Sequence, residues 1–298
     1  MNLKQLRYVA YVAESASISR AAQALNIAQP SLSHHISELE AELGVKLFHR
    51  TASGVTPTAP GHMFADRARA ILRSIEALTH EVRHVGVAPV GEVMVGLPTT
   101  MALHLTVPLV QAVRERFPGI RLRISEGMSG HIQEWVLSGR LDIAILYTAG
   151  PVDDLDIELV TSEELCLVSR PSGQTAPLKM RELSKYPLVL PGPDHGLRRT
   201  IERICRSAGV DLTVAVEVDS LPNMKLLAAD GALHTILPAA ACREDMAAGR
   251  LAVRKIVQPP LSRPIALATP RNRPMTAAME HVRLLLRDLI ADALRIGD

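Results

Sequence analysis

The chain has 298 residues, of which 47% are hydrophobic and 21% charged, and its net charge is +2. This composition excludes a disordered protein, and the length suggests two or three folded units. Aromatic residues make up only 3%, which argues against a surface that stacks single-stranded nucleic acid. With so small a net charge, any DNA binding must depend on local patterning.

The cysteines and the hydrophobic segments indicate the cellular compartment of the protein. Cys166, Cys205 and Cys242 lie far apart, without metal-binding spacing, and their odd number argues against a disulfide framework. The start of the chain lacks the features of a secretory signal, and no run of about 18 apolar residues could span a membrane. We therefore expect a cytoplasmic protein with no membrane partner, no metal and no cofactor.

The first part of the chain predicts two helices joined to a tight turn. Over residues 3–15 the apolar residues recur at helical spacing, and Ser17 is a suitable N-cap for a second helix that runs to Asn26. Asparagine tolerates a left-handed backbone conformation, so Asn26 can end this helix in a tight turn.

A third helix and a two-stranded wing follow. Pro30 suits the first turn of a helix, and Gly44 suits the position after its end. Between them runs one apolar stripe, formed by Leu32, Ile36, Leu39 and Leu43. The stretches VKLFHR and GVTPT are short strand candidates joined by the turn-like TASG.

Residues 58–86 predict a long helix that pairs two chains. Spacings of four and three residues alternate along the heptad positions Phe64, Ala68, Ile71, Ile75, Leu78, Val82 and Val85. A helix of this length would measure about 43 Å, too long for an ordinary core helix. The heptad favours dimerisation; the alternative is a long helix that lies on its own domain.

Beyond the Gly/Pro-containing hinge at 86–92, strand and helix patterns alternate. Strand candidates lie at 92–97, 120–125, 142–146, 164–169, 187–190, 213–218, 233–237 and 264–269. Helical patterns lie at 101–116, 130–138, 197–207, 221–229 and 275–294. The alternation predicts an α/β region with open, mostly parallel sheets, and so many strands fit two small lobes better than one sheet.

Residues 18–37 fit the helix-turn-helix pattern. Ala22 provides the small residue where the helices meet, Asn26 provides the turn, and the apolar anchors are Leu25, Ile27, Leu32 and Ile36. The opposite face of the second helix then carries Ser31, Ser33, His34, His35 and Ser37. Short polar side chains at a helix start suit contacts with base edges and phosphates. The alternative is a helical hairpin with a polar face.

Residues 1–61, with SISRAAQALNIAQPSLSHHISELE, LGVKLFHR and GVTPT..G, resemble the N-terminal domain of LysR-type transcriptional regulators. The resemblance is closest to the nitrogen assimilation control branch. It implies an α+β multidomain fold: a winged helix-turn-helix DNA-binding domain (1–58), a linker and dimerisation helix (59–88) and a two-lobe effector domain like periplasmic binding proteins (89–298). Lobe I would comprise about 90–162 and 266–298, and lobe II about 163–265.

The resemblance also implies DNA-contacting positions. Its recognition-helix positions are Gln29, Pro30, Ser31, Ser33, His34 and His35, and its wing positions are Arg50, Thr51 and Ser53. Many relatives carry Arg or Gln where this chain has His34 and His35, and a basic residue near 53. Base preference therefore cannot be copied from them. We expect His34 to contact a base, and His35 to contact a phosphate or be solvated.

Effector contacts are expected at strand-to-helix turns, where helix N-termini favour anions such as carboxylates. The candidates are Thr99, Thr100, Met101, Ser129, Gly130, Tyr147, Thr148, His195, Gly196 and Arg198. Any one of them could instead be a simple helix cap, but the set is expected to include two or three contacts. The dimerisation candidates are Phe64, Ala68, Ile71, Ile75, Leu78 and Val82.

No nucleophile elbow, HExxH, phosphate loop or dinucleotide motif occurs, so an enzyme is not expected. On a helix the adjacent His34 and His35 diverge by about 100° and cannot easily share a metal ion. The resemblance implies promoter DNA as a partner, a small-molecule effector, a homodimer or homotetramer, and RNA polymerase as a further candidate. The alternative is a cytoplasmic solute-binding protein without DNA function.

Overall fold

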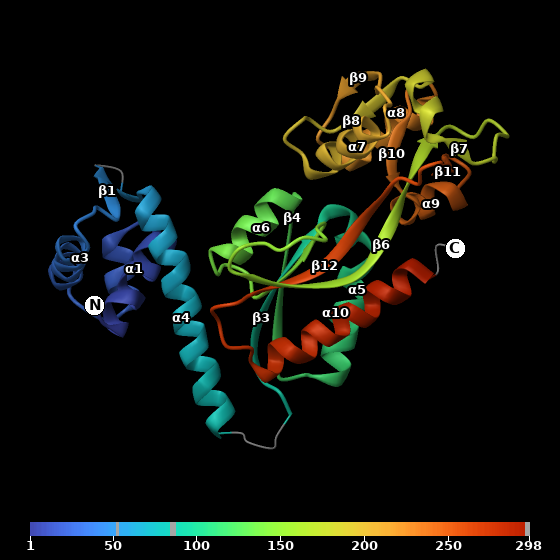
Figure 1. Ribbon diagram of the computed structural model, residues 1–298. Coiled ribbons are helices and arrows are strands. Elements are labelled where there is room, and N and C mark those ends of the chain that lie inside the picture. The colour runs from blue at the N-terminus through green and yellow to red at the C-terminus, as the bar shows by residue number, and fades with distance from the viewer. Residues whose placement is uncertain (52–53, 84–87, 296–298) are drawn as a thin grey trace.

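The computed structural model describes residues 1–51, 54–83 and 88–295 (Figure 1). An N-terminal helical unit with its wing packs on one long helix, and a two-lobe α/β region follows. The first unit contains α1 (Leu3–Ser15), α2 (Ile18–Ala24), α3 (Gln29–Leu43), β1 (Phe48–Thr51) and β2 (Gly54–Pro57). The long helix is α4 (Ala59–Arg83).

Local signals explain where the first two helices begin and end. Asn2 and Gln5 form a reciprocal capping box at the start of α1. The Ser17 side chain accepts the Arg20 N–H at 3.3 Å and so caps α2. Asn26 has φ +54°, the left-handed conformation that the turn between α2 and α3 requires. The Ile27 N–H donates to the Ala22 carbonyl at 3.0 Å and closes this turn.

The third helix buries its apolar stripe, with one exception. Leu32, Ile36 and Leu39 are at most 1% exposed, whereas Leu43 is 39% exposed. Leu43 lies in the last turn of α3, next to Gly44 with φ +70°, and so lies beyond the core that the stripe builds. The wing is an antiparallel hairpin in which Phe48 pairs with Pro57. At Gly61 a Cβ would lie 1.9 Å from the Leu47 carbonyl oxygen, so only glycine lets α4 start here.

The C-terminal region contains these strands: β3 (Gly91–Pro98), β4 (Ile120–Gly127), β5 (Ile143–Leu146), β6 (Leu155–Ser169), β7 (Leu178–Lys179), β8 (Leu188–Leu190), β9 (Val214–Glu217), β10 (Thr235–Pro238), β11 (Ala252–Val257) and β12 (Ser262–Pro270). Its helices are α5 (Thr99–Arg116), α6 (Ser129–Leu137), η1 (Met180–Lys185), α7 (Gly196–Ser207), α8 (Leu221–Asp230), η2 (Ala239–Cys242), α9 (Arg243–Ala247) and α10 (Ala277–Arg295). The sequence patterns did not predict β7, β11 or the first half of β6.

The expectation of mostly parallel sheets holds only in part. One sheet has the order β4-β3-β5-β12-β6-β11-β7, with β10 also paired to β6, and β8 pairs with β9 separately. Pairing is parallel for β3 with β4 and β5, but β12 and β6 pair antiparallel over most of their length. These two long strands run from one lobe into the other (Figure 1). One of these strands enters the second lobe and the other returns from it, so the two neighbours are antiparallel. The local alternation of strand and helix patterns in the sequence does not reveal this direction.

Each lobe has its own core. In lobe I, alternate β3 residues face opposite sides of the sheet: Val93 and Val95 pack under α5 and α10, and Met94 packs under α6. In lobe II, the ends of β6 and β10 pack with β8, α7 and α8. Because the cores are separate, the lobes are connected mainly by the two long strands and meet at a cleft.

Candidate DNA interface and interlobe cleft

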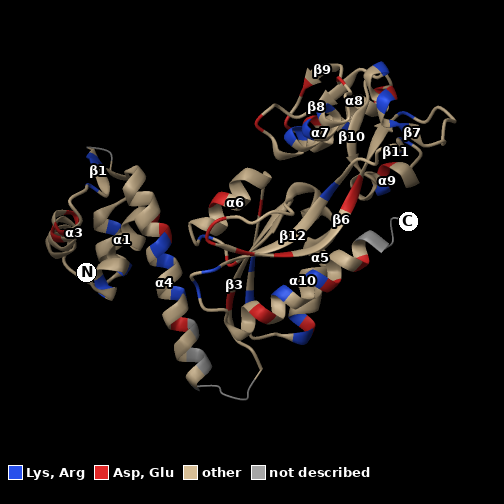
Figure 2. Ribbon diagram, viewed as in Figure 1, with Lys and Arg blue, Asp and Glu red and all other residues tan. Residues whose placement is uncertain are grey.

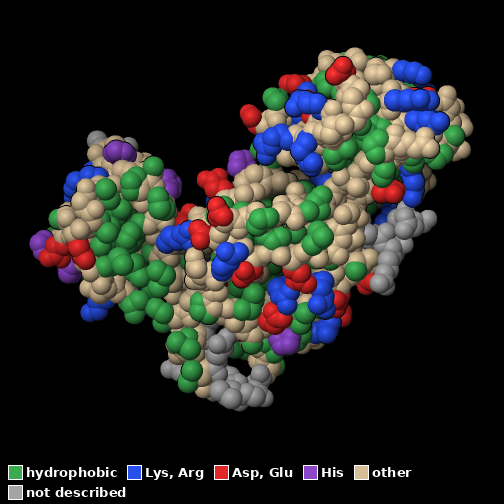
Figure 3. Space-filling model, in the orientation of Figure 1, with side chains coloured by type: hydrophobic (Ala, Val, Ile, Leu, Met, Phe, Trp, Pro, Cys, Tyr) green, Lys and Arg blue, Asp and Glu red, His purple; other side chains and the backbone are tan. Residues whose placement is uncertain are grey.

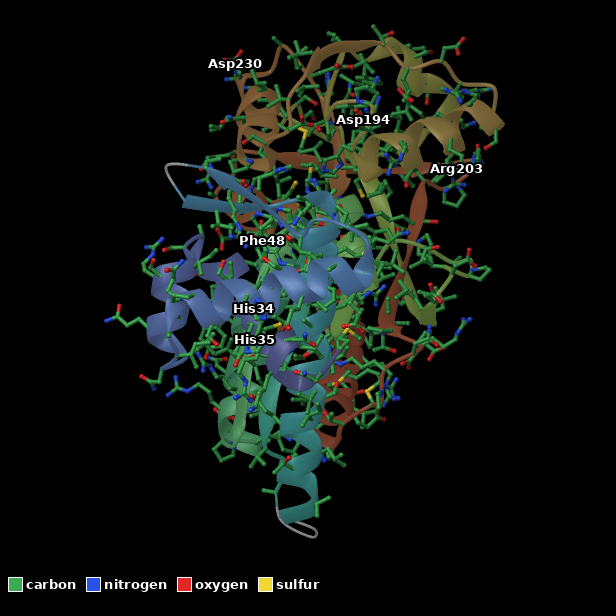
Figure 4. The ribbon with its side chains drawn as sticks, turned by 90° about the vertical axis from the view of Figure 1, so that its left-hand side faces the viewer. His34, His35, Phe48, Asp194, Arg203 and Asp230 are labelled. Atoms are coloured by element: carbon green, nitrogen blue, oxygen red, sulfur yellow. The ribbon has the colours of Figure 1, made fainter. Side chains whose placement is uncertain are left out.

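The outer face of α3 presents the polar residues that the helix-turn-helix pattern predicted. Gln29, Pro30, Ser31 and His34 are exposed, while Ser33 and His35 are half-buried. This face points away from the two lobes; His34 and His35 lie side by side on it (Figure 4). The helix start carries no side-chain cap, so its backbone N–H groups remain available to a phosphate.

A wing arginine lies against the recognition helix. The Arg50 guanidinium donates to Ser33 Oγ at 3.0 Å and to Ser37 Oγ at 3.2 Å. These contacts join β1 to α3 and hold a positive charge beside the face that would meet DNA. The sequence placed Arg50 in the wing and Ser33 on the helix, but gave no sign that they touch.

The two histidines share one carboxylate. His34 Nε2 and His35 Nδ1 each lie 3.1 Å from a different Glu38 carboxylate oxygen. His35 also stacks on Tyr8 of α1, with ring centroids 5.5 Å apart. His34 is therefore the freer of the two, with 71% of its side chain exposed against 40% for His35. Thr51 Oγ1 donates to the Gly54 carbonyl at 3.2 Å within the wing, and Ser53 lies outside the described residues.

A small pocket of about 80 Å³ lies between the lobes. Five of the sequence-predicted effector residues line it: Thr99, Thr100, Ser129, Tyr147 and His195. They come from the ends of β3 and β5 and the starts of α5, α6 and α7, as expected for an α/β cleft. Gly196 is close by, since a Cβ there would lie 3.4 Å from Ser129 Cβ.

Four other predicted effector residues do not line the pocket. Met101 is 3% exposed and belongs to the lobe I core. Gly130 is exposed and lies outside the lining, and the Thr148 hydroxyl is held by Gly150. The Arg198 guanidinium binds Glu202 at 2.5 Å and the Pro191 carbonyl at 3.0 Å. Arg198 thus fixes α7 within lobe II.

The sequence patterns missed the two charged side chains that line this pocket, Arg263 and Asp219. Arg263 of β12 is 3% exposed; it binds Glu163 at 2.5 Å and the Thr100 hydroxyl at 2.9 Å. Its guanidinium lies 3.5 Å from the Tyr147 ring centroid. Burial raises the pKa of Tyr147, so its phenol stays neutral. The missed signal is the pair of opposite charges inside otherwise apolar strand segments, SEELCLV and LSRPIALA.

Helix starts and a neutral histidine complete the pocket. The first turns of α5 and α6 carry no side-chain cap. His195 Nδ1 accepts the Leu197 N–H at 3.1 Å, which leaves the ring proton on Nε2 as a donor. Burial lowers the pKa of His195, so the neutral form is favoured. The pocket thus offers several donors to an acceptor oxygen, while Glu163 already balances the charge of Arg263.

The heptad side chains of α4 fall into two groups. Phe64 is half-buried against the core of the first unit, and Ala68 is 1% exposed. The remaining four are exposed: Ile71 44%, Ile75 36%, Leu78 59% and Val82 68%. An exposed apolar row on one helix is typical of an interface with another chain. Val85 lies outside the described residues.

All three cysteines are buried and carry no disulfide. Burial raises the pKa of Cys166 and Cys205 to about 11 and that of Cys242 to about 12. Thiols of this kind stay protonated at neutral pH and react poorly. Within the described ranges, no group of three or more His, Cys, Asp or Glu side chains could hold a metal ion, and no helix is long and apolar enough to cross a bilayer.

A winged helix-turn-helix with an exposed recognition helix, joined by a long helix to two lobes around a cleft, defines the class of DNA-binding regulators with an effector domain. The family described as "Bacterial regulatory helix-turn-helix protein, lysR family" matches residues 3–62. The family described as "LysR substrate binding domain" matches residues 87–291. The chain belongs to the LysR family of DNA-binding transcriptional regulators.

Similar proteins cover nearly the whole chain. The nitrogen assimilation regulatory protein nac of Escherichia coli is 30% identical over 98% of this chain and 96% of its own length. The hydrogen peroxide-inducible genes activator of Haemophilus influenzae is 27% identical over 99% of both chains. A full-length OxyR variant of Pseudomonas aeruginosa has the same fold, with a TM-score of 0.78, 24% identity and coverage of 99% and 97%. CbnR bound to its target DNA has a TM-score of 0.56, with 25% identity and coverage of 97% and 99%.

Proposed function

We propose that this regulator binds an inverted-repeat promoter site with the outer face of α3 and its wing. In this proposal residues 1–58 bind DNA, 59–88 pair two chains and 89–298 bind the effector. The observation that carries it is the polar face of α3, which includes His34 and the Arg50-bound Ser33. Two such helices in a symmetric dimer would enter successive major grooves, about 34 Å or a multiple of it apart.

The effector that best fits the interlobe pocket is a small molecule with acceptor oxygens, for which a carboxylate is the simplest choice. The uncapped starts of α5 and α6 and the Nε2–H of His195 are all donors. The pocket of about 80 Å³ admits only a few heavy atoms unless the lobes separate. Ligand binding would then shift the balance between lobe arrangements.

The nitrogen assimilation branch is a better candidate than peroxide sensing, although relatives of both kinds are similar to this chain. A peroxide-sensing cysteine needs an accessible thiolate. Cys166, Cys205 and Cys242 are buried, and burial raises the pKa of each. We expect hydrogen peroxide to leave DNA binding unchanged.

We further propose that the protein acts in the cytoplasm as a homodimer or homotetramer, with RNA polymerase as a partner at the promoter and without catalysis. The exposed row Ile71, Ile75, Leu78 and Val82 supports self-association. A solute-binding protein without DNA function remains the alternative; the polar outer face of α3 argues against it.

The test is a mobility-shift titration of the full chain on its own upstream DNA and on unrelated DNA. His34→Ala should weaken specific binding by about 1–3 kcal/mol, with a smaller effect on non-specific binding. Ser33→Ala should likewise weaken specific binding more than non-specific binding. It also removes one of the two hydrogen bonds that hold the Arg50 guanidinium against α3. His131→Ala, an exposed histidine of lobe I, is the matched control. Equal losses on both DNAs would rule out base contacts here, and no shift with a folded dimer would rule out DNA binding.

A further inference from the structure

A second, larger cavity lies at the junction between α4 and lobe I, apart from both surfaces described above. It has a volume of about 390 Å³, and four arginines line it: Arg69, Arg73, Arg123 and Arg140. The first two belong to α4; the others come from β4 and the turn after α6. Basic positions recur along the α4 ribbon (Figure 2), and charged side chains of both signs meet where this helix adjoins lobe I (Figure 3).

Positive charge is in excess in this cavity. The acidic residues in the lining are Asp66 and Glu14, so four guanidinium groups face two carboxylates, and His62 adds a titratable ring. Asp66 is already bound to Arg69 at 2.5 Å. An excess of arginine charge around a concave surface favours a multiply charged anion.

The two arginines of lobe I have free donors. Arg140 lies over the Trp135 ring, 4.5 Å from its centroid, which orients the guanidinium and leaves its N–H edges available. Arg123 is exposed and forms no ion pair or hydrogen bond with any other described residue. Planar guanidinium groups of this kind bind carboxylate and phosphate groups in a bidentate manner.

A buried ion cluster holds Arg73 of α4 against lobe I. Arg73 donates to the Gly139 carbonyl at 2.8 Å and lies 3.8 Å from Asp142, which is fully buried. Asp142 also binds Arg273 and accepts the Met94 N–H at 2.8 Å. Arg73 Nε is buried without a hydrogen-bond partner among the described residues. The cluster fixes α4 to lobe I through Arg73.

We propose that this cavity binds a small polyanion, carrying carboxylate or phosphate groups, that bridges the arginines of α4 and lobe I. Its volume is within the range of small-molecule sites, about 300–1,000 Å³. Such a ligand would favour the arrangement in which the linker helix lies against lobe I, because its partners come from both. The site is separate from the interlobe pocket and does not depend on DNA binding.

Isothermal titration of the full chain with citrate and with pyrophosphate tests this site and separates a carboxylate from a phosphate ligand. We expect at least one probe to bind with a Kd below about 1 mM. Arg123→Gln combined with Arg140→Gln should weaken this binding at least about tenfold, because two charged donors are lost. The matched control combines Arg116→Gln with Arg121→Gln, two arginines outside the cavity lining, and should bind as the wild type does.

Hydrogen exchange gives a second readout that also shows whether each variant is folded. The bound probe should slow exchange around residues 66–73 and 139–142 in the wild type, with no such effect in the variant lacking Arg123 and Arg140. If neither citrate nor pyrophosphate binds, the proposal is overturned. Undiminished binding in that variant would also overturn it, since the anion would then occupy another surface.

Discussion

Glu40 shows how one buried carboxylate organises the DNA-binding unit. It is 5% exposed, accepts the Leu47 N–H at 2.9 Å and the Phe48 N–H at 3.2 Å, and pairs with Lys46 at 2.7 Å. Burial alone would raise the pKa of Glu40, but Lys46 and the two backbone donors lower it below 4.5 overall. This single side chain fixes the end of α3 to the start of the wing.

Glu40→Gln should therefore lower the free energy of unfolding by about 1–2 kcal/mol at neutral pH, because the charge-assisted bonds are lost. A lowered folded-state pKa contributes stability above the ordinary value of 4.5 and loses it as the pH falls through the folded-state value. The difference between variant and wild type should thus disappear in acid. Urea unfolding at several pH values measures it.

The matched control is Glu42→Gln, which removes an exposed carboxylate that binds the chain's N-terminal amine at 2.8 Å. This change should cost below about 0.5 kcal/mol at any pH. A Glu40→Gln loss that is the same at neutral and acidic pH would show that the ionised carboxylate is not what stabilises the wing.

The exposed apolar row on α4 predicts that two chains pair through this helix. Ile71 and Ile75 are 44% and 36% exposed on the heptad row, so a partner helix would bury them. Replacing both with Asp should place two charges in that interface and dissociate the dimer, as measured by sedimentation velocity. Met63→Asp is the matched control, since Met63 is 63% exposed on the same helix but lies outside the heptad positions. An unchanged sedimentation profile for the double variant would refute the paired-helix assignment.

Across the whole molecule, the two lobes are joined by β6 and β12, and one buried ion pair links these strands. Glu163 and Arg263 are each 3% exposed and lie 2.5 Å apart, beside the interlobe pocket. Bending of these two strands would let the lobes separate and admit a ligand larger than the pocket of about 80 Å³. Arg263 of this pair lines the interlobe pocket.

Arg263→Met should lower the free energy of unfolding by about 3–5 kcal/mol, because it leaves the Glu163 carboxylate buried without its partner. Adding Glu163→Met should restore much of this loss, since an apolar pair of similar volume replaces the ion pair. Thermal and urea unfolding of the single and double variants measure both effects. Equal destabilisation of the two variants would contradict an unpaired charge as the cause.

The sequence was sufficient for features that depend on near neighbours in the chain. Ser17, Asn26 and Gly44 mark helix ends through backbone chemistry, and the spacing of Leu32, Ile36 and Leu39 sets the buried face of α3. Strand and helix patterns likewise predicted most elements of the lobes. The outward position of His34 followed from that buried face alone.

Contacts between distant segments required the tertiary structure. Arg50 meets Ser33, Arg263 meets Glu163, and Arg73 meets Asp142 across 17, 100 and 69 positions of the chain, and no local spacing encodes such pairs. The antiparallel crossing of β6 and β12, the small interlobe pocket and the arginine-lined cavity follow from how separate segments pack. Local propensity sets helices and turns within a few residues, whereas charge pairing and cavities depend on the fold that brings remote side chains together.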